Sequence, residues 1–253
     1  MPTALAVSPH LDDAAFSCGG TLARLAAAGW RVVVATAFTR SVARPTGFAL
    51  ACQTDKGLGP DVDYMAVRRV EDGAALAALR AEPVWLDLAE APHRGYGSAA
   101  ELFGPLGTDD EAGPDVLRLV AAQVEALEPD LILAPQAIGG HVDHVQVVRA
   151  LEALSPRQPV LWWRDFPYVS RDAEPAEPFR VMMEGRAEIG VVLDGAASAA
   201  KREACRAYGT QLGFQFGGQA GLDAALARAG ARETFRLTGT LPDDIASSPG
   251  SWS

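Results

Sequence analysis

Two short segments hold most of the side chains that could do chemistry. His10 and Asp13 lie in "SPHLDD", directly after the apolar run "TALAV". His141 and His144 lie in "GGHVDH", directly after the apolar run "LILAPQ", and of the four histidines in the chain only His93 lies elsewhere. Two imidazoles and one carboxylate form the kind of three-ligand set that holds catalytic zinc and leaves one coordination position open. The residue types therefore predict a metal centre.

The chemistry expected at such a centre is attack of activated water on a carbonyl carbon. A bound metal lowers the pKa of water to roughly 7, and a nearby carboxylate can accept the proton. Asp12 is adjacent to Asp13, and neighbouring side chains point in different directions, so one can bind metal while the other acts as the general base. His141 and His144 are one helical turn apart and face the same way. A histidine opposite the carboxylates could stabilise an oxyanion or protonate a leaving amine.

Each segment also has a purely structural explanation. Two aspartates before a helix often act as an N-cap and a first-turn carboxylate. A single pair of histidines at helical spacing is a weak motif. Gly19 and Gly20 could form a phosphate loop, but GxGxxG and the Walker pattern are both absent, so close packing of strand and helix is the alternative. The two clusters favour chemistry because both follow strand-like runs.

The elements that must position these clusters alternate along the chain. Apolar runs predict strands at 3–8, 31–38, 83–88, 131–136 and 159–164. Apolar residues at helical spacing predict helices at 19–29, 66–81, 114–128 and 143–154. This alternation predicts an α/β fold, a Rossmann-like and mostly parallel sheet flanked by helices. Ligands bind beyond the carboxyl ends of such strands, where both clusters are expected to meet.

The C-terminal part of the chain has a different pattern. "FRVMMEG" and "EIGVVLDG" predict two short strands that add a hairpin or edge strands to the sheet, followed by a helix over 196–212. The stretches 40–64 and 89–113 are long, rich in Gly and Pro, and follow predicted strands, so we expect them to border the site and to select the substrate. Residues 243–253 predict a poorly ordered tail. One domain is expected over residues 1–253.

Composition narrows the possible partners. The formal net charge of -10 opposes binding to nucleic acids and to anionic membranes, so a neutral or cationic small molecule is the expected partner. No apolar run is long enough for a membrane helix, and the N-terminus lacks the features of a signal peptide. Cys18, Cys52 and Cys205 have no zinc-ribbon spacing and predict free thiols in a cytoplasmic protein. The sequence does not predict an oligomeric state.

At these residues the sequence resembles the PIG-L/LmbE family of metal-dependent N-deacetylases. Residues 9–13 match the family's PHxDD signature, and residues 141–144 match its HxDH signature. Three further stretches are similar to an RxxE helix, a D-x-P-Y element and a K-x-x-A…Q helix of the family: "VRRVEDGAALAAL" at 67–79, "RDFPY" at 164–168 and "KREACRAYGTQ" at 201–211.

The resemblance implies a role for each residue of the two signatures. His10, Asp13 and His144 would bind Zn²⁺, and Fe²⁺ is also compatible with nitrogen and oxygen ligands. Asp12 would be the general base, and His141 the acid or the oxyanion partner. These roles agree with the chemistry inferred from the residue types.

The resemblance also implies positioning and substrate contacts. Asp143 would orient the histidine two residues before it. Arg68, Tyr168 and Gln211 would contact the substrate. An ion pair between Arg68 and Glu71 is a second interpretation, and core or helix-surface positions are alternatives for the tyrosine and the glutamine.

The sequence departs from the family pattern at two positions that we assign neither as ligands nor as the base. Leu11 stands where proline is common, and Ala14 replaces a glutamate that often follows the two aspartates. We therefore expect the chemistry to survive, with changed surroundings of the metal.

The function implied is removal of an acetyl group from an N-acetylglucosamine-type conjugate. An amidase for larger acyl or thiol-conjugate amides is the alternative within enzymes. A catalytically silent metal-binding or sugar-binding protein is an alternative of another class, but metal binding alone does not require Asp12 and His141. A Rossmann-type nucleotide-binding protein is disfavoured by the missing glycine motifs.

Overall fold

The apolar runs of the first two thirds of the chain form the parallel part of one sheet. Helices cover both faces of this part, which is why its inner strands are apolar and buried, whereas the edge strand at 82–85 is largely exposed. The structure is a computed structural model that describes residues 1–171, 174–242 and 245, and within them the strand order is β3-β2-β1-β4-β5-β7-β6. The strands are β1 (Thr3–Ser8), β2 (Arg31–Thr36), β3 (Glu82–Trp85), β4 (Leu131–Pro135), β5 (Val160–Trp163), β6 (Ala187–Val192) and β7 (Arg232–Thr238). β1 to β5 pair in parallel, whereas β7 is antiparallel to both of its neighbours.

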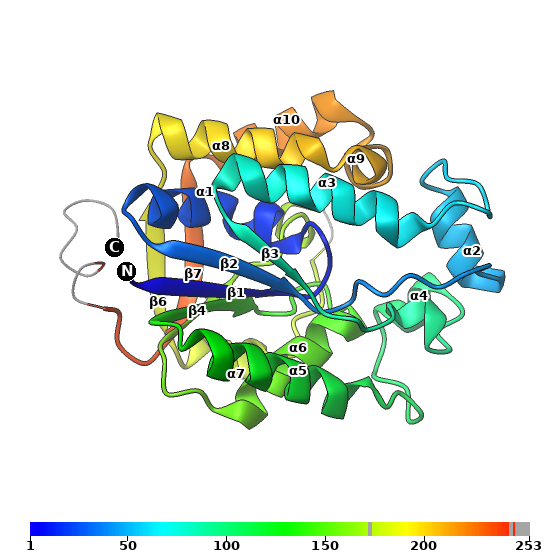
Figure 1. Ribbon diagram of the computed structural model, residues 1–253, viewed down its shortest axis with the longest axis horizontal. Coiled ribbons are helices and arrows are strands. Elements are labelled where there is room, and N and C mark those ends of the chain that lie inside the picture. The colour runs from blue at the N-terminus through cyan, green and yellow to red at the C-terminus, as the bar shows by residue number, and fades with distance from the viewer. Residues whose placement is uncertain (172–173, 243–244, 246–253) are drawn as a thin grey trace.

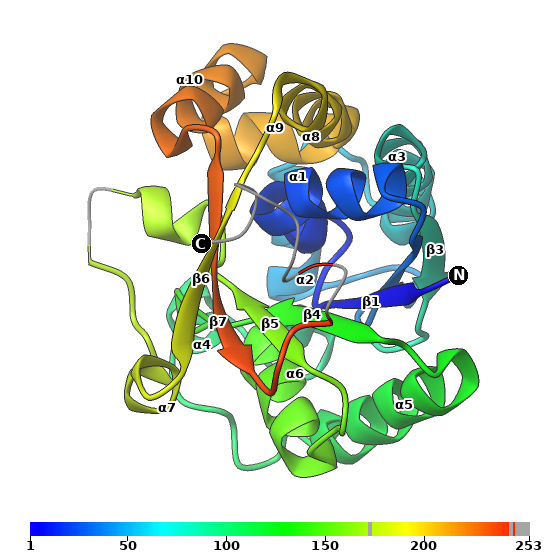
Figure 2. The same ribbon diagram turned by 90° about the vertical axis from the view of Figure 1, so that its left-hand side faces the viewer.

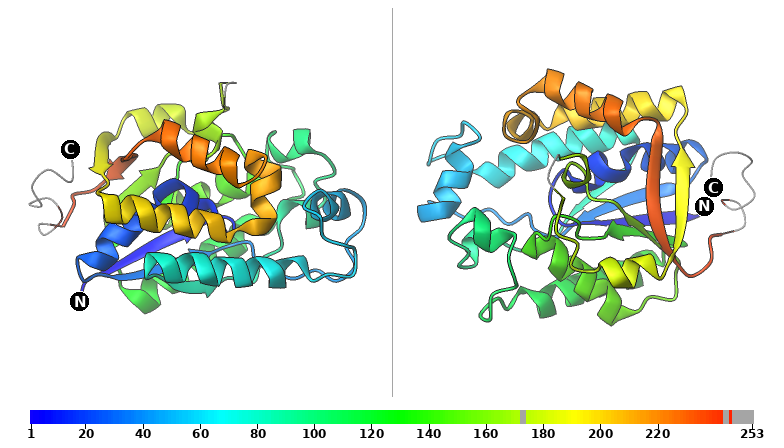
Figure 3. Two further views of the ribbon diagram at one scale, coloured as in Figure 1. Left: turned by 90° about the horizontal axis from the view of Figure 1, so that it is seen from above. Right: turned by 180° about the vertical axis from the view of Figure 1, so that it is seen from behind.

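Helices lie on both faces of the sheet (Figure 1). α1, α3 and α8 pack together on one face, where Figure 3 shows α3 and α8 side by side, and α5 packs on α6 on the other face. No helix in the described part of the chain is long and apolar enough to cross a membrane. The helices are α1 (Asp13–Ala27), α2 (Gly47–Thr54), α3 (Tyr64–Leu79), α4 (Ala99–Leu102), α5 (Ala112–Leu127), α6 (Val142–Leu154), α7 (Arg180–Glu184), α8 (Gly195–Ala207), α9 (Gly209–Phe216) and α10 (Gln219–Ala229), with 3-10 turns η1 (Ala91–His93) and η2 (Tyr168–Ser170).

Two hydrophobic cores result from the alternation of side chains along each strand. In β1, Ala4 and Ala6 face the core beneath α1, α3 and α8, whereas Leu5 and Val7 face the core beneath α5 and α6. The sheet is thereby held from both sides, and its carboxyl edge is left for loops.

The strand order places a switch point between β1 and β4. The chain runs outward from β1 to β3, and then returns to begin the other half of the sheet at β4. In open α/β sheets the crevice beyond the carboxyl ends at such a point is where ligands bind. α2 and α4 lie beyond this edge, at the right of Figure 1.

The predicted α/β sheet and its five parallel strands are confirmed, with shifted ends. The helix predicted at 19–29 begins earlier, at Asp13, and the one predicted at 196–212 is divided into α8 and α9 at Tyr208. The two unassigned stretches are not structureless, since 40–64 contains α2 and 89–113 contains η1, α4 and the start of α5. The predicted tail at 243–253 lies, except for Ile245, outside the described residues.

The predicted edge addition is present, but one of its two predicted strands is wrong. Residues 180–184 form the helix α7, and β6 pairs instead with β7, which the sequence did not predict (Figure 2). In a strand Val181 and Met183 would share one face. In α7 they point to different sides of the helix, so that Met183 is buried and Val181 is 86% exposed.

Gly20 supports close packing as the role of the glycine pair. It lies within α1, and a Cβ there would be 2.3 Å from Leu193 Cδ1. The backbone amide of Gly20 also donates to Glu233 Oε1 at 3.0 Å. No phosphate-loop geometry is involved, because the pair continues a helix.

Candidate active site and metal centre

The structure brings the two histidine segments together beyond β1 and β4. His10 follows β1, and Asp13 is the first residue of α1. His141 is the N-cap of α6, and His144 lies in the first turn of that helix. The ring of His10 is 4.8 Å from that of His141 and 5.2 Å from that of His144, centroid to centroid. Segments 130 residues apart therefore share one site.

Asp13 lies between two imidazoles. Its Oδ2 atom is 3.3 Å from His10 Nδ1 and 3.2 Å from His144 Nε2. The three ligand atoms all lie within 4.8 Å of one another. His144 Nε2 is buried and makes no hydrogen bond within the described residues. A buried nitrogen lone pair beside a carboxylate fits a metal ion, which would give that atom its missing partner.

The far nitrogen of each of these imidazoles is held by a second carboxylate. His10 Nε2 is 2.9 Å from Asp143 Oδ2, and His144 Nδ1 is 2.8 Å from Asp165 Oδ1. Histidines that bind metal almost always donate their other ring N–H to such a partner, which fixes the tautomer. His10, His141 and Asp143 form a second cluster with metal-ligand spacing. The first cluster fits better, since Asp143 is already engaged by His10.

The carboxylates favour positive charge at this point of the molecule. Burial lowers the pKa of His144, but Asp13 and Asp165 outweigh burial and raise that pKa to about 9. The pKa of His10 is likewise raised, because Asp13 and Asp143 outweigh burial. A divalent cation between the two rings would satisfy the same electrostatic demand.

Asp12 points to a different partner from its neighbour. Its Oδ2 atom is 3.2 Å from one guanidinium nitrogen of Arg68. The other terminal nitrogen of Arg68 is 2.8 Å from Glu90 Oε1. Burial raises the pKa of Asp12 to about 6, against the opposing effect of Arg68. Glu71 does not pair with Arg68 and instead accepts from the amide and hydroxyl of Thr210. The interpretation of Arg68 as an i,i+3 partner of Glu71 is therefore wrong.

His141 contacts Asp143 through the backbone. The Asp143 amide donates to His141 Nδ1 at 3.2 Å, whereas its carboxylate hydrogen-bonds to His10, so the expectation that the Asp143 side chain orients His141 is wrong. Because Nδ1 accepts, the ring proton of a neutral His141 is on Nε2. Burial and the neighbouring His10 lower the pKa of His141 to about 3, so the ring is neutral.

A pocket of about 220 Å³ opens onto this cluster. It is lined by His10, Asp12, Asp13 and His141, and by all three residues expected to contact substrate, Arg68, Tyr168 and Gln211. Aromatic side chains of α2, α9 and the segment after α4 form its apolar wall: Phe48, Phe214 and Phe103. The unassigned loops therefore do border the site.

Tyr168 and Gln211 both line the pocket but have different neighbours. The ring of Tyr168 packs 5.9 Å from that of His144, centroid to centroid. Gln211 is buried, and its amide donates to Tyr64 Oη at 3.3 Å and to Thr210 Oγ1 at 2.8 Å. Both side chains line the cavity and also contribute to packing.

Sequence reasoning did not single out several residues of the site. Asp165 lies in the "RDFPY" element, which was the one available signal for it. Glu90, Arg94 and Lys56 lie in the two unassigned stretches, where no periodic pattern marks them. Lys56 Nζ is 4.6 Å from the centroid of the Phe214 ring, which places a cation at the pocket wall.

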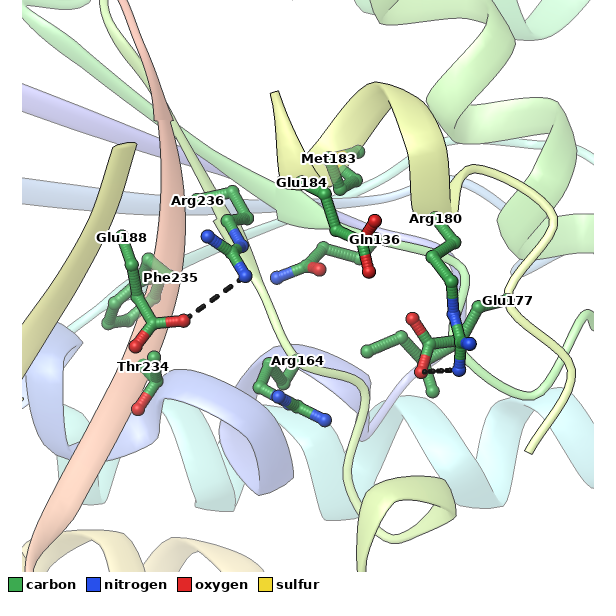
Figure 4. Close-up of a pocket in the computed structure, with 11 residues that line it drawn as sticks. Gln136, Arg164, Glu177, Arg180, Met183, Glu184, Glu188, Thr234, Phe235 and Arg236 are labelled. Carbon is green, nitrogen blue, oxygen red and sulfur yellow. Dashed lines mark hydrogen bonds and ion pairs between the residues drawn. The ribbon is translucent and has the colours of Figure 1, made fainter. Parts of the chain in front are cut away.

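A second cavity of about 250 Å³ lies between α7, β7 and the end of β5 (Figure 4). Four of its charged side chains form two ion pairs: Arg236 with Glu188 at 3.2 Å, and Arg180 with Glu177 at 3.4 Å. It holds no histidine, and no cluster with metal-ligand spacing was found there among the described residues. The first pocket is therefore the candidate active site.

The chain is similar to characterised deacetylases in sequence. The family profile described as "PIG-L: GlcNAc-PI de-N-acetylase" matches residues 5–155. Over 187 residues the chain is 37% identical to 2'-N-acetylparomamine deacetylase of Streptomyces fradiae, a match that covers 72% of this chain. The chain spans 63% of the length of that relative.

Solved structures of deacetylases are also similar over nearly the whole chain. The zinc-inhibited form of a teicoplanin deacetylase superposes with a TM-score of 0.76 at 25% identity, covering 96% of this chain and 99% of that one. The deacetylase of the A40926 pseudoaglycone has a TM-score of 0.76 at 28% identity, with 93% and 96% covered. The similarity thus includes the C-terminal region that the family profile does not reach.

Proposed function

Because the chain belongs to the PIG-L family, the family of GlcNAc-PI de-N-acetylase, we propose that it is a zinc-dependent hydrolase that removes the N-acetyl group from an amino sugar conjugate. The observation that carries this proposal is the set of His10, Asp13 and His144, with Asp12 beside it at the base of a pocket. Two imidazoles and one carboxylate leave room for water and substrate.

The three ligand residues would hold the metal through His10 Nδ1, a carboxylate oxygen of Asp13 and His144 Nε2. When bound there, zinc would act as a Lewis acid on the amide carbonyl and would lower the pKa of water. Fe²⁺ is compatible with the same donors. Asp143 and Asp165 keep both rings in the tautomers that leave these nitrogens free.

Asp12 and His141 would carry out the proton transfer and the charge stabilisation. Asp12 accepts a proton from the water that attacks the amide carbon, and returns it to the nitrogen as the C–N bond breaks. A pKa of about 6, raised by burial and opposed by Arg68, keeps Asp12 ionised near neutral pH yet close to the optimum for a base. His141, which is neutral, donates its Nε2–H to the developing oxyanion.

The charges of the pocket support an amino sugar as substrate. Among its lining side chains are five carboxylates and two cations: Asp12, Asp13, Asp55, Glu90, Asp143, Lys56 and Arg68. Arg68 pairs with Asp12 and Glu90, Arg94 pairs with Asp143 from outside the lining, and a metal would face Asp13. Asp55, which is exposed, could face an ammonium group of a conjugate. The similar deacetylases are named for 2'-N-acetylparomamine and for the pseudoaglycone of the antimicrobial reagent A40926.

A larger acyl group is the second candidate, and one contact favours it. The ring of Phe103 is 5.3 Å from that of His141 and 5.8 Å from that of Tyr168, centroid to centroid. An apolar acyl chain would find a wall beside the reacting carbonyl there. A series of N-acyl glucosamine conjugates from acetyl to octanoyl separates the candidates, because a deacetylase loses kcat/KM as the chain lengthens.

A cytoplasmic location is part of the proposal. All three cysteines are free, and Cys18 and Cys205 are buried. Free thiols are typical of reducing compartments.

The proposal is tested by metal content and turnover measured on the same samples. We expect one transition metal per chain in the wild type by elemental mass spectrometry, and acetate release from N-acetylated amino sugar conjugates at one metal per chain. His144→Ala should lose metal and turnover, whereas Asp12→Ala should keep metal and lose turnover. His93→Ala is the matched control, since this histidine lies outside both clusters. No metal in the wild type after zinc addition, or full occupancy in His144→Ala, contradicts the proposal.

A further inference from the structure

Arg94 lies between two buried carboxylates in the loop after β3. A guanidinium nitrogen of Arg94 is 2.7 Å from Asp143 Oδ1 and 3.0 Å from Asp110 Oδ2. The side chains of Asp143 and Asp110 are 0% and 1% exposed, and that of Arg94 is 13% exposed. A buried carboxylate needs such a partner, because removal of the charge from water is costly.

The two oxygens of Asp143 face different partners. Oδ1 pairs with Arg94, and Oδ2 accepts from the Ala91 amide at 3.1 Å and from His10 Nε2 at 2.9 Å. A continuous chain of contacts thus runs from Arg94 through Asp143 to a residue that we assign as a metal ligand. Arg94 itself is not one of the residues that line the pocket, and it reaches the pocket only through Asp143.

The rest of the loop holds Arg94 in place. Its guanidinium donates to the Ala89 carbonyl at 2.7 Å and, through Nε, to Asp110 Oδ1 at 3.0 Å. Tyr96 Oη donates to Asp110 Oδ2 at 2.9 Å and accepts from the Gly107 amide at 3.0 Å. Both ends of the segment 89–110 are therefore tied to this one side chain.

We propose that Arg94 is a positioning residue that holds Asp143 against His10 and thereby sets the affinity of the site for its metal. The inference rests on the proposed function for the identity of the ligands. Without Arg94, Asp143 is a buried carboxylate with one charged partner fewer, and its carboxyl group is free to turn from His10. The metal site would then form one structural unit with the loop that borders the substrate pocket.

The test is the affinity for zinc, measured by competition with a chromophoric chelator. Loss of the group that orients a metal-binding histidine typically lowers metal affinity by about 10–100-fold. We expect a loss of this size in Arg94→Met and a smaller one in Arg94→Lys, which keeps the charge but cannot bridge both carboxylates. Arg118→Met is the matched control, since Arg118 makes an exposed pair with Asp115, and its affinity should equal that of the wild type.

A second variant distinguishes the effect of Arg94 on Asp143 from its effect on the structure of the loop 89–110. Asp110→Asn weakens the anchor of Arg94 but leaves the pair of Arg94 and Asp143, so its loss of affinity should be smaller than that of Arg94→Met. Thermal unfolding of the metal-free proteins reports whether each variant is folded. Wild-type zinc affinity in Arg94→Met, or equal losses in Arg94→Met and Asp110→Asn, overturns the inference.

The same measurements distinguish failure of the inference from failure of the proposed function. If the wild type releases acetate and Arg94→Met binds zinc normally, only the inference fails. If Arg94→Met loses zinc affinity but the wild type releases acetate from no conjugate, only the deacetylase proposal fails. A wild type that binds no zinc overturns both.

Discussion

At the scale of single residues, the two ring nitrogens of each candidate metal-binding histidine have different partners. One nitrogen of His10 and of His144 faces Asp13, and the other is fixed by Asp143 or Asp165. The arrangement buries several carboxylates, which is favourable only where positive groups face them. The buried carboxylates around the two imidazoles therefore favour a cation at this site.

Asp165 allows a test of whether a second carboxylate fixes the tautomer of His144. It accepts from His144 Nδ1 and from the amides of Gln136 and Ile138 at 3.1 and 2.9 Å. We expect Asp165→Asn to lower zinc affinity about 10–100-fold, because the amide no longer enforces the tautomer with Nε2 free. Chelator competition measures the effect, and Asp87→Asn, which replaces an exposed carboxylate, is the control. Unchanged affinity in Asp165→Asn would contradict the role.

The residues that we propose as ligands are recognisable in the sequence, whereas the carboxylates and the arginine that hold them are not. His10 with Asp13 and His141 with His144 are local patterns three residues apart. Asp165 is 21 residues from the histidine it holds, and Arg94 lies in a stretch without periodicity. Side-chain pairs of this kind are set by the fold, and a single sequence has no local signal for them.

At the scale of elements, the loop between β4 and α6 determines where Tyr168 lies. Gly139 has a φ of +100°, and a Cβ there would be 2.7 Å from Tyr168 Cγ. The absence of a side chain thus allows the aromatic ring to pack directly on the backbone beside His141.

Gly139→Ala should displace Tyr168 and lower turnover. A misplacement of about 1 Å in a substrate-positioning group costs on the order of a hundredfold in rate, and the positive φ adds about 1–3 kcal/mol of strain. The values of kcat and KM, with urea unfolding, separate the two effects. Gly213→Ala is the control, because a Cβ there meets nothing within 4 Å and helix propensity favours alanine. Normal turnover in Gly139→Ala would show that the position of Tyr168 is unimportant.

A buried ion pair connects three other elements. Lys201 Nζ of α8 is 2.6 Å from Glu233 Oε1 of β7, and Glu233 also accepts from the amides of Gly20 and Thr21 in α1. Removal of one partner of a buried pair costs about 3–5 kcal/mol.

Lys201→Met should therefore reduce the free energy of unfolding by about 3 kcal/mol, at the lower end of the range for buried pairs, because Glu233 keeps its other donors. Glu233→Leu should cost more, since it leaves the Lys201 ammonium with only the Ser17 carbonyl at 3.4 Å and removes the acceptor of two amides and of the Thr21 hydroxyl. Urea denaturation measures both. The exposed pair of Arg206 and Asp223 is the comparison, where Arg206→Met should cost less than about 1 kcal/mol. A smaller loss in Glu233→Leu than in Lys201→Met would contradict this account.

The inner parallel strands could be predicted because burial on both faces gives them apolar runs, and β3, which is largely exposed at the edge, was marked by the run "PVWLDL". β7 was missed because the buried positions of "RETFRLT" begin with the charged Glu233, so that only Phe235 and Leu237 show the alternation of a half-buried strand. Residues 180–184 mislead for the opposite reason. "RVMME" is apolar enough for a strand, but arginine, methionine and glutamate are good helix formers, and no partner strand lies beside them.

At the scale of the whole molecule, stability and function occupy different regions. The two hydrophobic cores lie on the faces of the sheet, and the metal site lies beyond its carboxyl edge. The ligands come from segments that flank β1 and β4, which are held by strand pairing to one another and by both cores. We therefore expect the sheet to fold without the metal, and a bound metal to add to its stability.

Chelation of the metal should lower the melting temperature and leave the fold intact. A ligand that binds only the folded state adds about 2.7 kcal/mol at 100 times its Kd. In a domain of this size, 1 kcal/mol corresponds to about 2–4 °C, so zinc should raise the melting temperature of the stripped protein by about 5–10 °C. Calorimetry measures the shift, circular dichroism follows the fold, and His144→Ala should show no shift on zinc addition. Stripped protein that unfolds outright at room temperature would mean that the metal holds the sheet together, as in zinc fingers. The separation of the cores from the site makes the smaller, reversible shift the expected result.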